Sequence, residues 1–349
     1  FDDVVYVDRK RVSEKQLLRA GDILICASSG SKELVGKAAY VECDLPMTFG
    51  AFCKVVRPKT DCPQYIGHFF NSPYYRERIA NSAAGANINN IRNEHIDVLE
   101  IVWPSIEEQR SAVTVLDKVS ELISLRKEQL AKLDRLVKSR FIELFDDPEH
   151  NEKTIPTLPM TELCEIIDGD RGANYPKQEE FSDNGFCLFL NAKNVTANGF
   201  SFENCMFITA EKDKLMRKGK LSRGDVVLTT RGTIGNLAFY DGAVPYEHIR
   251  INSGMVILRM KRERITERFF IEQFKMQLAS IKEKIASGSA QPQLPISTMN
   301  KIVMLVPDVE LQHQFAAFVE QTDKSKLAIQ QSLAKLELLK KTLMQEYFG

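Results

Sequence analysis

Two short polar stretches in the second half of the chain carry side chains suited to reading nucleic acid. One is the turn from Thr230 to Asn236, and the other is the loop from Ser287 to Gln293. Arg, Asn, Gln, Ser and Thr offer donors and acceptors that match base edges in the major groove of DNA. Basic runs could hold phosphates; they comprise Lys212, Lys214, Arg217, Lys218, Lys220 and Arg223 in one run, and Arg9, Lys10, Arg11, Lys15 and Arg19 in another.

Three other stretches resemble catalytic motifs but depart from them. Asn71-Ser72-Pro73-Tyr74 resembles the motif with which amino-methyltransferases hold a flipped adenine, yet its second position is Ser and no Gly-rich S-adenosylmethionine loop is present. Gly30 to Lys37 has glycines one residue too far apart for a P-loop, with Ala38 in place of Ser or Thr. Asp147, Glu152 and Lys153 fit a solvated linker better than a nuclease triad. The five histidines form no metal spacing. We expect no catalytic centre.

The chain repeats itself at an offset of 203 residues. Pro104 and Pro307 open nearly the same phrase, Gln129 to Asp134 matches Ser332 to Glu337, and Gly21-Asp22 matches Gly224-Asp225. The loop after the Gly-Asp pair is four residues longer in the first copy. The chain is therefore two related modules, each a mixed region followed by a helix.

The repeat also sets the predicted domain boundaries. The second module begins near Asp146, and the first would need roughly sixty residues before Phe1 to match its length, so we expect the first module to be truncated. We predict two mixed domains, two helices and a linker with these bounds: domain one 1–103, helix 104–145, linker 146–153, domain two 154–306 and helix 307–349.

Composition places the chain among soluble globular proteins. Of its 349 residues 44% are hydrophobic and 27% charged, and no apolar run is long enough to span a membrane. The seven cysteines form no C-x-x-C pair, which favours reduced thiols in a cytoplasmic protein. A formal net charge of zero argues against a general polyanion binder but allows local basic patches.

The segment after each repeated proline is predicted to be one long helix. Ser105 with Glu108 forms a capping box, and Asp308 can cap the second helix. Each helix would run about 40 residues, or roughly 60 Å, so it needs a partner along its side; we expect the other copy, packed antiparallel. Residues at coiled coil spacing, interrupted at Arg126, would form the contact: Leu116, Val119, Ile123, Leu130, Leu133, Val137, Ile329, Leu333, Leu336 and Leu343.

The regions before the helices are predicted to mix strands and helices. Phe186 to Leu190, Val226 to Thr230, Leu237 to Tyr240 and Met255 to Arg259 are short β-branched or aromatic runs between turn residues. Phe269 to Ile285 returns to helical spacing. The fold class is α+β, with two tandem domains, each followed by a long helix.

Comparing the modules shows a shared framework with different loops. Cys26 to Lys32 faces Thr229 to Thr233, and Asn87 to Asn90 faces Ala290 to Gln293. Two modules that recognise different ligands with one shared framework are expected to differ in this way. The predicted DNA contacts are Ser28, Ser29, Ser31, Lys32, Ser82, Asn87, Asn89, Asn90, Lys193, Asn194, Thr230, Arg231, Gly232, Thr233, Asn236, Arg250, Asn252, Ser287, Ser289, Gln291 and Gln293.

The sequence resembles the specificity (S) subunits of type I restriction-modification enzymes. The resemblance rests on several features spread over nearly the whole chain: the Pro-x-x-Glu-x-Gln helix starts (Pro104, Glu107, Gln109; Pro307, Glu310, Gln312), the linker Leu144 to Pro148, the stretch Leu163 to Gly169, Gly224-Asp225 with Arg231 to Gly235, and the loop Gly288 to Pro292.

The resemblance implies two target recognition domains joined by antiparallel helices, each domain reading one half of a split DNA site. It implies double-stranded DNA, two modification (M) subunits and restriction (R) subunits as partners. S-adenosylmethionine, ATP and Mg would then be cofactors of those partners and not of this chain, which catalyses nothing. Two alternatives stay open at this point: a self-contained DNA methyltransferase or nuclease fragment, and a coiled coil adaptor for other proteins.

Overall fold

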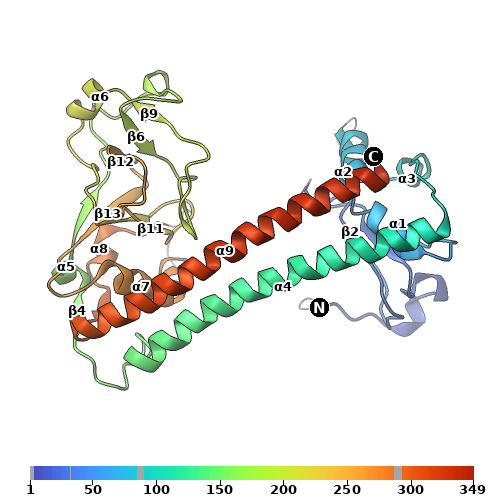
Figure 1. The fold of residues 1–349 in the computed structure, drawn as a ribbon, viewed down its shortest axis with the longest axis horizontal. Helices are drawn as coiled ribbons and strands as arrows, with labels where there is room; N and C mark the ends of the chain where they lie inside the picture. Colours follow the sequence, from blue (N-terminus) through green and yellow to red (C-terminus); the bar gives the residue numbers. More distant parts are fainter. Residues whose placement is uncertain (1–3, 32, 85–89, 287–292) are drawn as a thin grey trace. The chain divides into compact units, whose positions relative to one another are not determined.

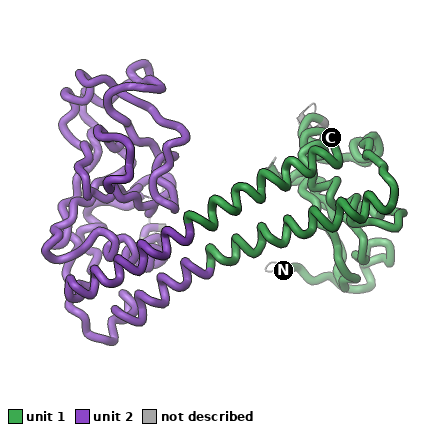
Figure 2. Tube along the Cα trace, in the orientation of Figure 1, with its two compact units in different colours: residues 1–131, 327–349 green, residues 132–326 purple. Residues whose placement is uncertain are grey.

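The computed structural model describes residues 4–31, 33–84, 90–286 and 293–349, and its mixed helices and strands confirm the α+β class (Figure 1). The chain forms two compact units (Figure 2). Unit 1 holds residues 1–131 and 327–349, and unit 2 holds residues 132–326. Each long helix therefore contributes one part to each unit. The units are divided by spatial packing, whereas the predicted domain bounds are taken from the sequence repeat.

The two long helices, α4 (Ile106–Phe145) and α9 (Val309–Phe348), pack antiparallel, as predicted. In unit 1 Lys127 of α4 lies 3.1 Å from Glu337 of α9. In unit 2 Asp134 of α4 lies 2.7 Å from Lys326 of α9. Position rises along α4 while it falls along α9, so the chains run in opposite directions. The two acids are 203 positions apart and are therefore repeat-related, whereas the two lysines are 199 positions apart and are not.

Both helices begin where the capping signals place them. The Ser105 hydroxyl accepts from the backbone N–H of Glu108 at 3.3 Å, and the Glu108 carboxylate accepts from the Ser105 N–H at 2.9 Å. The Asp308 carboxylate accepts from the N–H of Glu310 at 2.9 Å. Each cap satisfies donors that the first helical turn would leave unpaired.

The residues predicted to form the contact between the helices are buried or half-buried. Leu116, Val119 and Val137 are buried, and the other seven positions are half-buried: Ile123, Leu130, Leu133, Ile329, Leu333, Leu336 and Leu343. Arg126, which interrupts the coiled coil spacing, is half-buried and donates to Gln129 at 2.7 Å. Lys340 stands 203 positions after Val137; burial lowers the pKa of its ammonium group, against a smaller opposing effect of Asp117.

The glutamine in each helix start connects the helix to its own module. The Gln312 amide donates to the carbonyls of Pro307 (2.9 Å) and Arg264 (3.0 Å), and its oxygen accepts from the N–H of Thr266 (2.8 Å). Gln109 donates to the Pro104 carbonyl at 2.9 Å, but its oxygen has no partner among the described residues. The residue 203 positions before Thr266 is a proline, which has no N–H to give.

Unit 1 builds a three-stranded antiparallel sheet in the order β2-β1-β3. Its core joins residues of the sheet and of α1 to Leu116 of α4 and Phe348 of α9. The elements before α4 are η1 (Arg9–Arg11), η2 (Glu14–Gln16), β1 (Ile23–Cys26), β2 (Ala38–Tyr40), β3 (Cys53–Val56), α1 (Pro63–Phe69), α2 (Pro73–Ala84) and α3 (Asn93–Asp97).

Unit 2 builds a four-stranded antiparallel sheet, β11-β10-β13-β5, and a three-stranded sheet, β12-β6-β9, in which β12 and β6 are parallel. Its largest core joins the four-stranded sheet to Phe141 and Phe145 of α4 and Phe315 of α9. The elements between α4 and α9 are β4 (Thr157–Pro159), α5 (Met160–Leu163), β5 (Cys164–Asp168), η3 (Gln178–Glu180), β6 (Cys187–Leu190), β7 (Val195–Thr196), β8 (Gly199–Phe200), β9 (Phe207–Ile208), α6 (Ala210–Leu215), β10 (Asp225–Thr229), β11 (Leu237–Phe239), β12 (Ile249–Ile251), β13 (Met255–Met260), α7 (Glu267–Ala286), α8 (Ile296–Met299) and β14 (Val303–Leu305).

A buried carboxylate anchors the same turn in both sheets. Asp22 accepts two hydrogen bonds from Arg57, both at 2.7 Å, and Asp225 accepts two from Arg259, at 2.9 and 2.8 Å. The glycine before each carboxylate has φ of +86° or +95°, in the left-handed region that favours glycine. Burial alone would raise the pKa of Asp22, but the hydrogen bonds from Arg57 and from the Arg19 backbone hold it below its usual value.

We expect Asp22→Asn to lower the free energy of unfolding of unit 1 by about 2 kcal/mol at pH 7, because Arg57 keeps its charge and loses a bidentate partner. The folded pKa of Asp22 lies below the unfolded value of about 3.9, so the carboxylate stabilises fully at neutral pH and less as the pH falls through the folded pKa. The difference between variant and wild type should therefore shrink in acid. Urea unfolding followed by the fluorescence of Trp103, the one tryptophan, measures it.

Asp225→Asn is the matched control, since Asp225 lies in unit 2 and Trp103 in unit 1. It should leave the transition reported by Trp103 in place. Identical urea midpoints for Asp22→Asn and wild type at pH 7 would contradict the role of the ion pair.

Candidate nucleic-acid interface

Three chain segments meet at one end of the four-stranded sheet in unit 2. Because β10 runs antiparallel to both β11 and β13, and β13 runs antiparallel to β5, the carboxyl ends of β10 and β5 lie at the amino ends of β11 and β13. The segments at this end are the turn 230–236, residues 252–254 and the loop that follows Asp168. We call this end of the sheet the tip of unit 2.

Backbone hydrogen bonds bring the turn 230–236 together with Gln293 and Leu294 at this tip. The N–H groups of Thr230 and Arg231 donate to the carbonyl of Gly254 at 2.8 and 3.2 Å. The N–H of Leu294 donates to the Thr230 carbonyl at 2.9 Å, and Arg231 forms an isolated β-bridge with Gln293. The structure thus places Arg231 and Gln293, predicted separately and far apart in sequence, side by side.

Unit 1 has the same frame at the same end of its sheet. The N–H groups of Ala27 and Ser28 donate to the carbonyl of Phe52 at 2.8 and 3.0 Å, the N–H of Ile91 donates to the Ala27 carbonyl at 2.7 Å, and Ser28 forms a β-bridge with Asn90. These bonds match those of unit 2 one for one. The two tips therefore share a backbone scaffold and differ in the side chains that it carries.

The turn of unit 2 is held down on the body of its module. The Thr229 hydroxyl donates to the carbonyl of Thr233 and accepts from the N–H of Asn236 at 3.0 Å. Gly235 has φ of +93°, and a Cβ there would lie 2.3 Å from a methyl carbon of Leu278 in α7. A side chain at this position would push the turn off α7, so glycine is required for its close approach.

Most described residues of the predicted contact set reach solvent. Seven are exposed, namely Ser31, Asn90, Lys193, Arg231, Gly232, Thr233 and Gln293. Four are half-buried, namely Ser28, Ser29, Asn236 and Asn252. Six lie outside the described residues, namely Lys32, Asn87, Asn89, Ser287, Ser289 and Gln291, and for Ser82 only the backbone is described.

Arg250 is a correction to the predicted set, because its guanidinium is buried inside unit 2. It lies 2.6 Å from the Asp213 carboxylate and donates to the carbonyls of Lys218, Asp213 and Met216 at 2.7, 2.7 and 3.1 Å. Burial alone would raise the pKa of Asp213, but hydrogen bonds from Lys220 and Arg250 hold it below its usual value. Arg250 organises the loop before β10, and its guanidinium is buried away from the surface that DNA could reach.

Asn194 and Thr230 also have structural roles. The Asn194 amide is fully buried and donates to the carbonyls of Ser201 and Asn204, both at 3.0 Å, while its oxygen accepts from the N–H of Asn191 at 2.9 Å. The buried hydroxyl of Thr230 donates to the Gly254 carbonyl at 3.0 Å. Sequence alone could not separate these polar groups from exposed ones of the same types.

The basic run of unit 2 is divided between structure and surface. The Lys212 ammonium bonds to Glu180 at 2.9 Å, and Lys220 pairs with Asp213. The Arg223 guanidinium stacks 4.1 Å from the ring centroid of Tyr240 and binds nearby carbonyls. The remaining cations of the run are exposed at the surface: Lys214, Arg217 and Lys218.

Two of the stretches considered as catalytic motifs form local structural contacts instead. The Asn71 amide donates to the Gly67 carbonyl at 2.9 Å, and the Ser72 hydroxyl accepts from the N–H of Tyr75 at 3.2 Å, which caps α2. In the linker, the Asp146 carboxylate accepts from the N–H of Lys153 at 2.9 Å and so ends α4. Among the described residues no His, Cys, Asp and Glu group is arranged to hold a metal ion.

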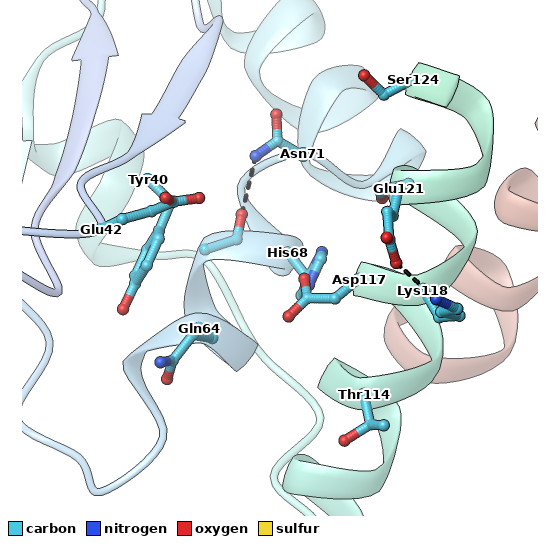
Figure 3. A pocket seen from close by; sticks show the side chains of 12 residues that line it. Tyr40, Glu42, Gln64, His68, Asn71, Thr114, Asp117, Lys118, Glu121 and Ser124 are labelled. Atoms are coloured by element: carbon cyan, nitrogen blue, oxygen red, sulfur yellow. Dashed lines mark hydrogen bonds and ion pairs between the residues drawn. The ribbon is translucent and has the colours of Figure 1, made fainter. Parts of the chain in front are cut away.

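A cleft of about 960 Å³ in unit 1 lies between β2, α1 and α4 (Figure 3). His68 and Asp117 meet across it at 2.8 Å, and burial lowers the pKa of His68 despite the opposing effect of Asp117. Glu42 and Glu121 also line it. Three carboxylates line the cleft against one lysine, Lys118, which pairs with Glu121 at 2.7 Å. The excess negative charge is unfavourable to a phosphate backbone, so the tips remain the candidate interface.

Sequence comparison missed two features of the tips. Phe52 is 70% exposed and stands where unit 2 has Gly254, so an aromatic ring projects from the tip of unit 1 alone. Arg171 follows Asp168 at the tip of unit 2. The sequence signal for Phe52 was an aromatic residue in the connection before a strand.

The comparisons with known proteins agree with this architecture. The family model for the type I restriction modification DNA specificity domain matches residues 5–135 and 153–339, and the chain belongs to this family. It is similar to the type I restriction enzyme EcoKI specificity subunit of Escherichia coli K12, with 25% identity over 99% of this chain and 78% of that protein. It also resembles the StySPI specificity subunit of Salmonella potsdam, with 39% identity over 39% of this chain and 30% of that protein.

Solved structures share the fold. An S subunit from M. genitalium has a TM-score of 0.52 at 18% identity, covering 95% of this chain and 83% of that one. A chain from a study of the assembly and conformational transition of the type I R-M system has a TM-score of 0.54 at 18% identity, covering 95% and 82%. None of the described helices is long and apolar enough to cross a lipid bilayer.

We expect Arg250→Ala to lower the free energy of unfolding by about 3 kcal/mol, because it leaves Asp213 buried with one partner fewer. Arg231→Ala should change it by less than about 0.5 kcal/mol, since Arg231 is exposed. Urea unfolding followed by circular dichroism compares the two. Equal losses in both variants would contradict the division of these arginines into structural and available ones.

Proposed function

We propose that this chain is the specificity subunit of a type I restriction-modification complex, in which each tip reads one half of a split, asymmetric DNA site. The observation that carries the proposal is the shared tip frame, with Ser28 bridged to Asn90 in unit 1 and Arg231 bridged to Gln293 in unit 2. A fixed frame with exchanged side chains is what two readers of different bases require, since base identity is read by side-chain donors and acceptors.

The antiparallel helices would set the unread spacer between the two half-sites. Repeated framework surfaces would dock two copies of one M subunit, because two identical partners need two matching surfaces. Methyl transfer to adenine, with S-adenosylmethionine, and ATP-driven translocation and cleavage, with Mg, would belong to the M and R subunits. In this proposal the chain itself supplies recognition in the cytoplasm and performs no chemical step.

The charge distribution supports local contacts with DNA. The net charge is zero, so long-range attraction to DNA is weak, and affinity must come from the exposed cations near the tips and from partner subunits. Lys214, Arg217 and Lys218 are suited to phosphate contacts, which position a protein without reading sequence. Binding should accordingly weaken as salt rises.

The test of this function is an exchange of the second recognition domain. Replacing residues 154–306 with those of a relative that methylates a different site should change one half of the methylated-adenine motif in the host and leave the other half and the spacer unchanged. Sequencing of methylated adenines reads the result. A motif that stays whole, or one that changes in both halves, would contradict the proposal.

Two alternatives are separated by binding measurements. A self-contained methyltransferase or nuclease would bind S-adenosylmethionine or a metal ion without partners, which calorimetry on the chain detects. A coiled coil adaptor would give no salt-dependent shift of duplex DNA when the M subunit is added.

Arg231→Ala should lower the affinity of the complex for its DNA site by about 1 to 3 kcal/mol if the guanidinium makes a bidentate base contact. The loss should be confined to the half-site read by unit 2. Fluorescence anisotropy with the M subunits present measures it, with scrambled duplex as the reference. Unchanged affinity and unchanged site choice would remove the turn from the interface.

A further inference from the structure

A loop that the repeat could not reveal stands at the tip of unit 2. β5 ends at Asp168, which pairs with Val256 at the start of β13, so the residues after it emerge at the tip. Gly169 lies so close to the neighbouring loop that a Cβ there would meet the Asn252 carbonyl oxygen at 2.2 Å. The loop 168–172 is therefore packed against residues 252–254, whose Gly254 carbonyl holds Arg231.

Arg171 in this loop carries an available guanidinium. Its side chain is 50% exposed and lies 3.2 Å from the Asp168 carboxylate and 3.3 Å from the Ser253 carbonyl. Arg250, in contrast, is bound at 2.6 to 3.1 Å and buried. Long contacts at an exposed site are exchanged for new partners at little cost.

Arg171 and Arg231 border the same recess. It has a volume of about 240 Å³, and its wall also includes Asp168 and Gln293. Two guanidinium groups supply forked donors, while the carboxylate and the amide supply acceptors. This combination matches the donor and acceptor pattern of base-pair edges in the major groove.

A third segment is tied to the same loop and adds positive charge. The Asp170 carboxylate accepts from the N–H groups of Gly172, Arg217 and Lys218 at 2.8, 2.7 and 3.4 Å. These hydrogen bonds outweigh burial and hold the pKa of Asp170 below its usual value. Its charge is thus satisfied within the protein, while the side chains of Arg217 and Lys218 are exposed.

We propose that Arg171 is a specificity-determining residue that reads a base together with Arg231, and that Arg217 and Lys218 hold the phosphates beside that base. The inference rests on the proposed function of the tip and adds a third reading segment to it. The segment is absent from the comparison of the two modules because residues 147–203, which include Arg171, have no counterpart at the offset of 203.

The test uses the chain in complex with its M subunits and a duplex that carries the methylated site of the host. Arg171→Gln should weaken binding to this duplex about tenfold or more and relax the base preference at one position of the half-site read by unit 2. Arg171→Lys keeps the charge but loses the fork, so it should retain the relaxed preference. Arg217→Gln should weaken binding to all sequences and reduce the slope of log affinity against log salt by about 0.9.

Arg264→Gln is the matched control. Its side chain is 54% exposed in a surface ion pair with Glu162, and it follows the far end of β13, so it should bind like wild type. Wild-type behaviour of Arg171→Gln, with Arg231→Ala still impaired, would overturn the role of Arg171 and leave the proposed function standing. Full recovery of base preference by Arg171→Lys would also overturn it, as a phosphate contact needs only charge. Failure of the wild-type complex to bind the duplex would instead overturn the proposed function.

Discussion

The core of unit 1 and the largest core of unit 2 both depend on the antiparallel pairing of α4 and α9. The core of unit 1 includes Leu116 from α4 and Phe348 from α9, and the core of unit 2 includes Phe141 from α4 and Phe315 from α9. A helix of this length has little stability alone, since helix stability in proteins comes mainly from packing of its apolar face. The sheets in turn cannot bury their apolar faces without the helices, so recognition regions and helices stabilise one another.

The two modules keep the same framework residues at positions where a substitution would destabilise the fold. Asp22 with Arg57 and Asp225 with Arg259 are near-identical ion pairs, and removing one member would leave a charge poorly compensated. The glutamines differ: Gln312 has three hydrogen-bond partners, whereas Gln109 keeps only the carbonyl of the helix-start proline and lacks counterparts of the Thr266 donor and the Arg264 acceptor. The tips face solvent, where substitutions change the free energy of unfolding little. Stability therefore depends mainly on the framework residues, and the choice of bases depends on the residues at the tips.

Positive charge illustrates the same separation within one unit. Arg250 and Lys212 donate to carboxylates and carbonyls of the segments that precede β10, and Arg223 donates to carbonyls of the segment that follows β11. Arg171 and Arg231 remain at the solvent edge of a small recess. Because these paired cations hold the loops in place, less of the backbone remains to be ordered when the exposed arginines bind.

The repeat, the caps at Ser105 and Asp308 and the heptad spacing were enough to determine from sequence the two long helices and their mutual packing, because helix signals are local and a 3.5-residue period implies a partner. The sequence also identified the turn 230–236 and the residue Gln293 as loop positions. Only tertiary structure decided that Arg231 and Gln293 are neighbours, that Arg250 and Asn194 are buried, and that Arg171 joins the tip. Side-chain type is a property of the chain, but exposure and proximity depend on which strands pair, and strand pairing is set by long-range contacts that no local pattern specifies.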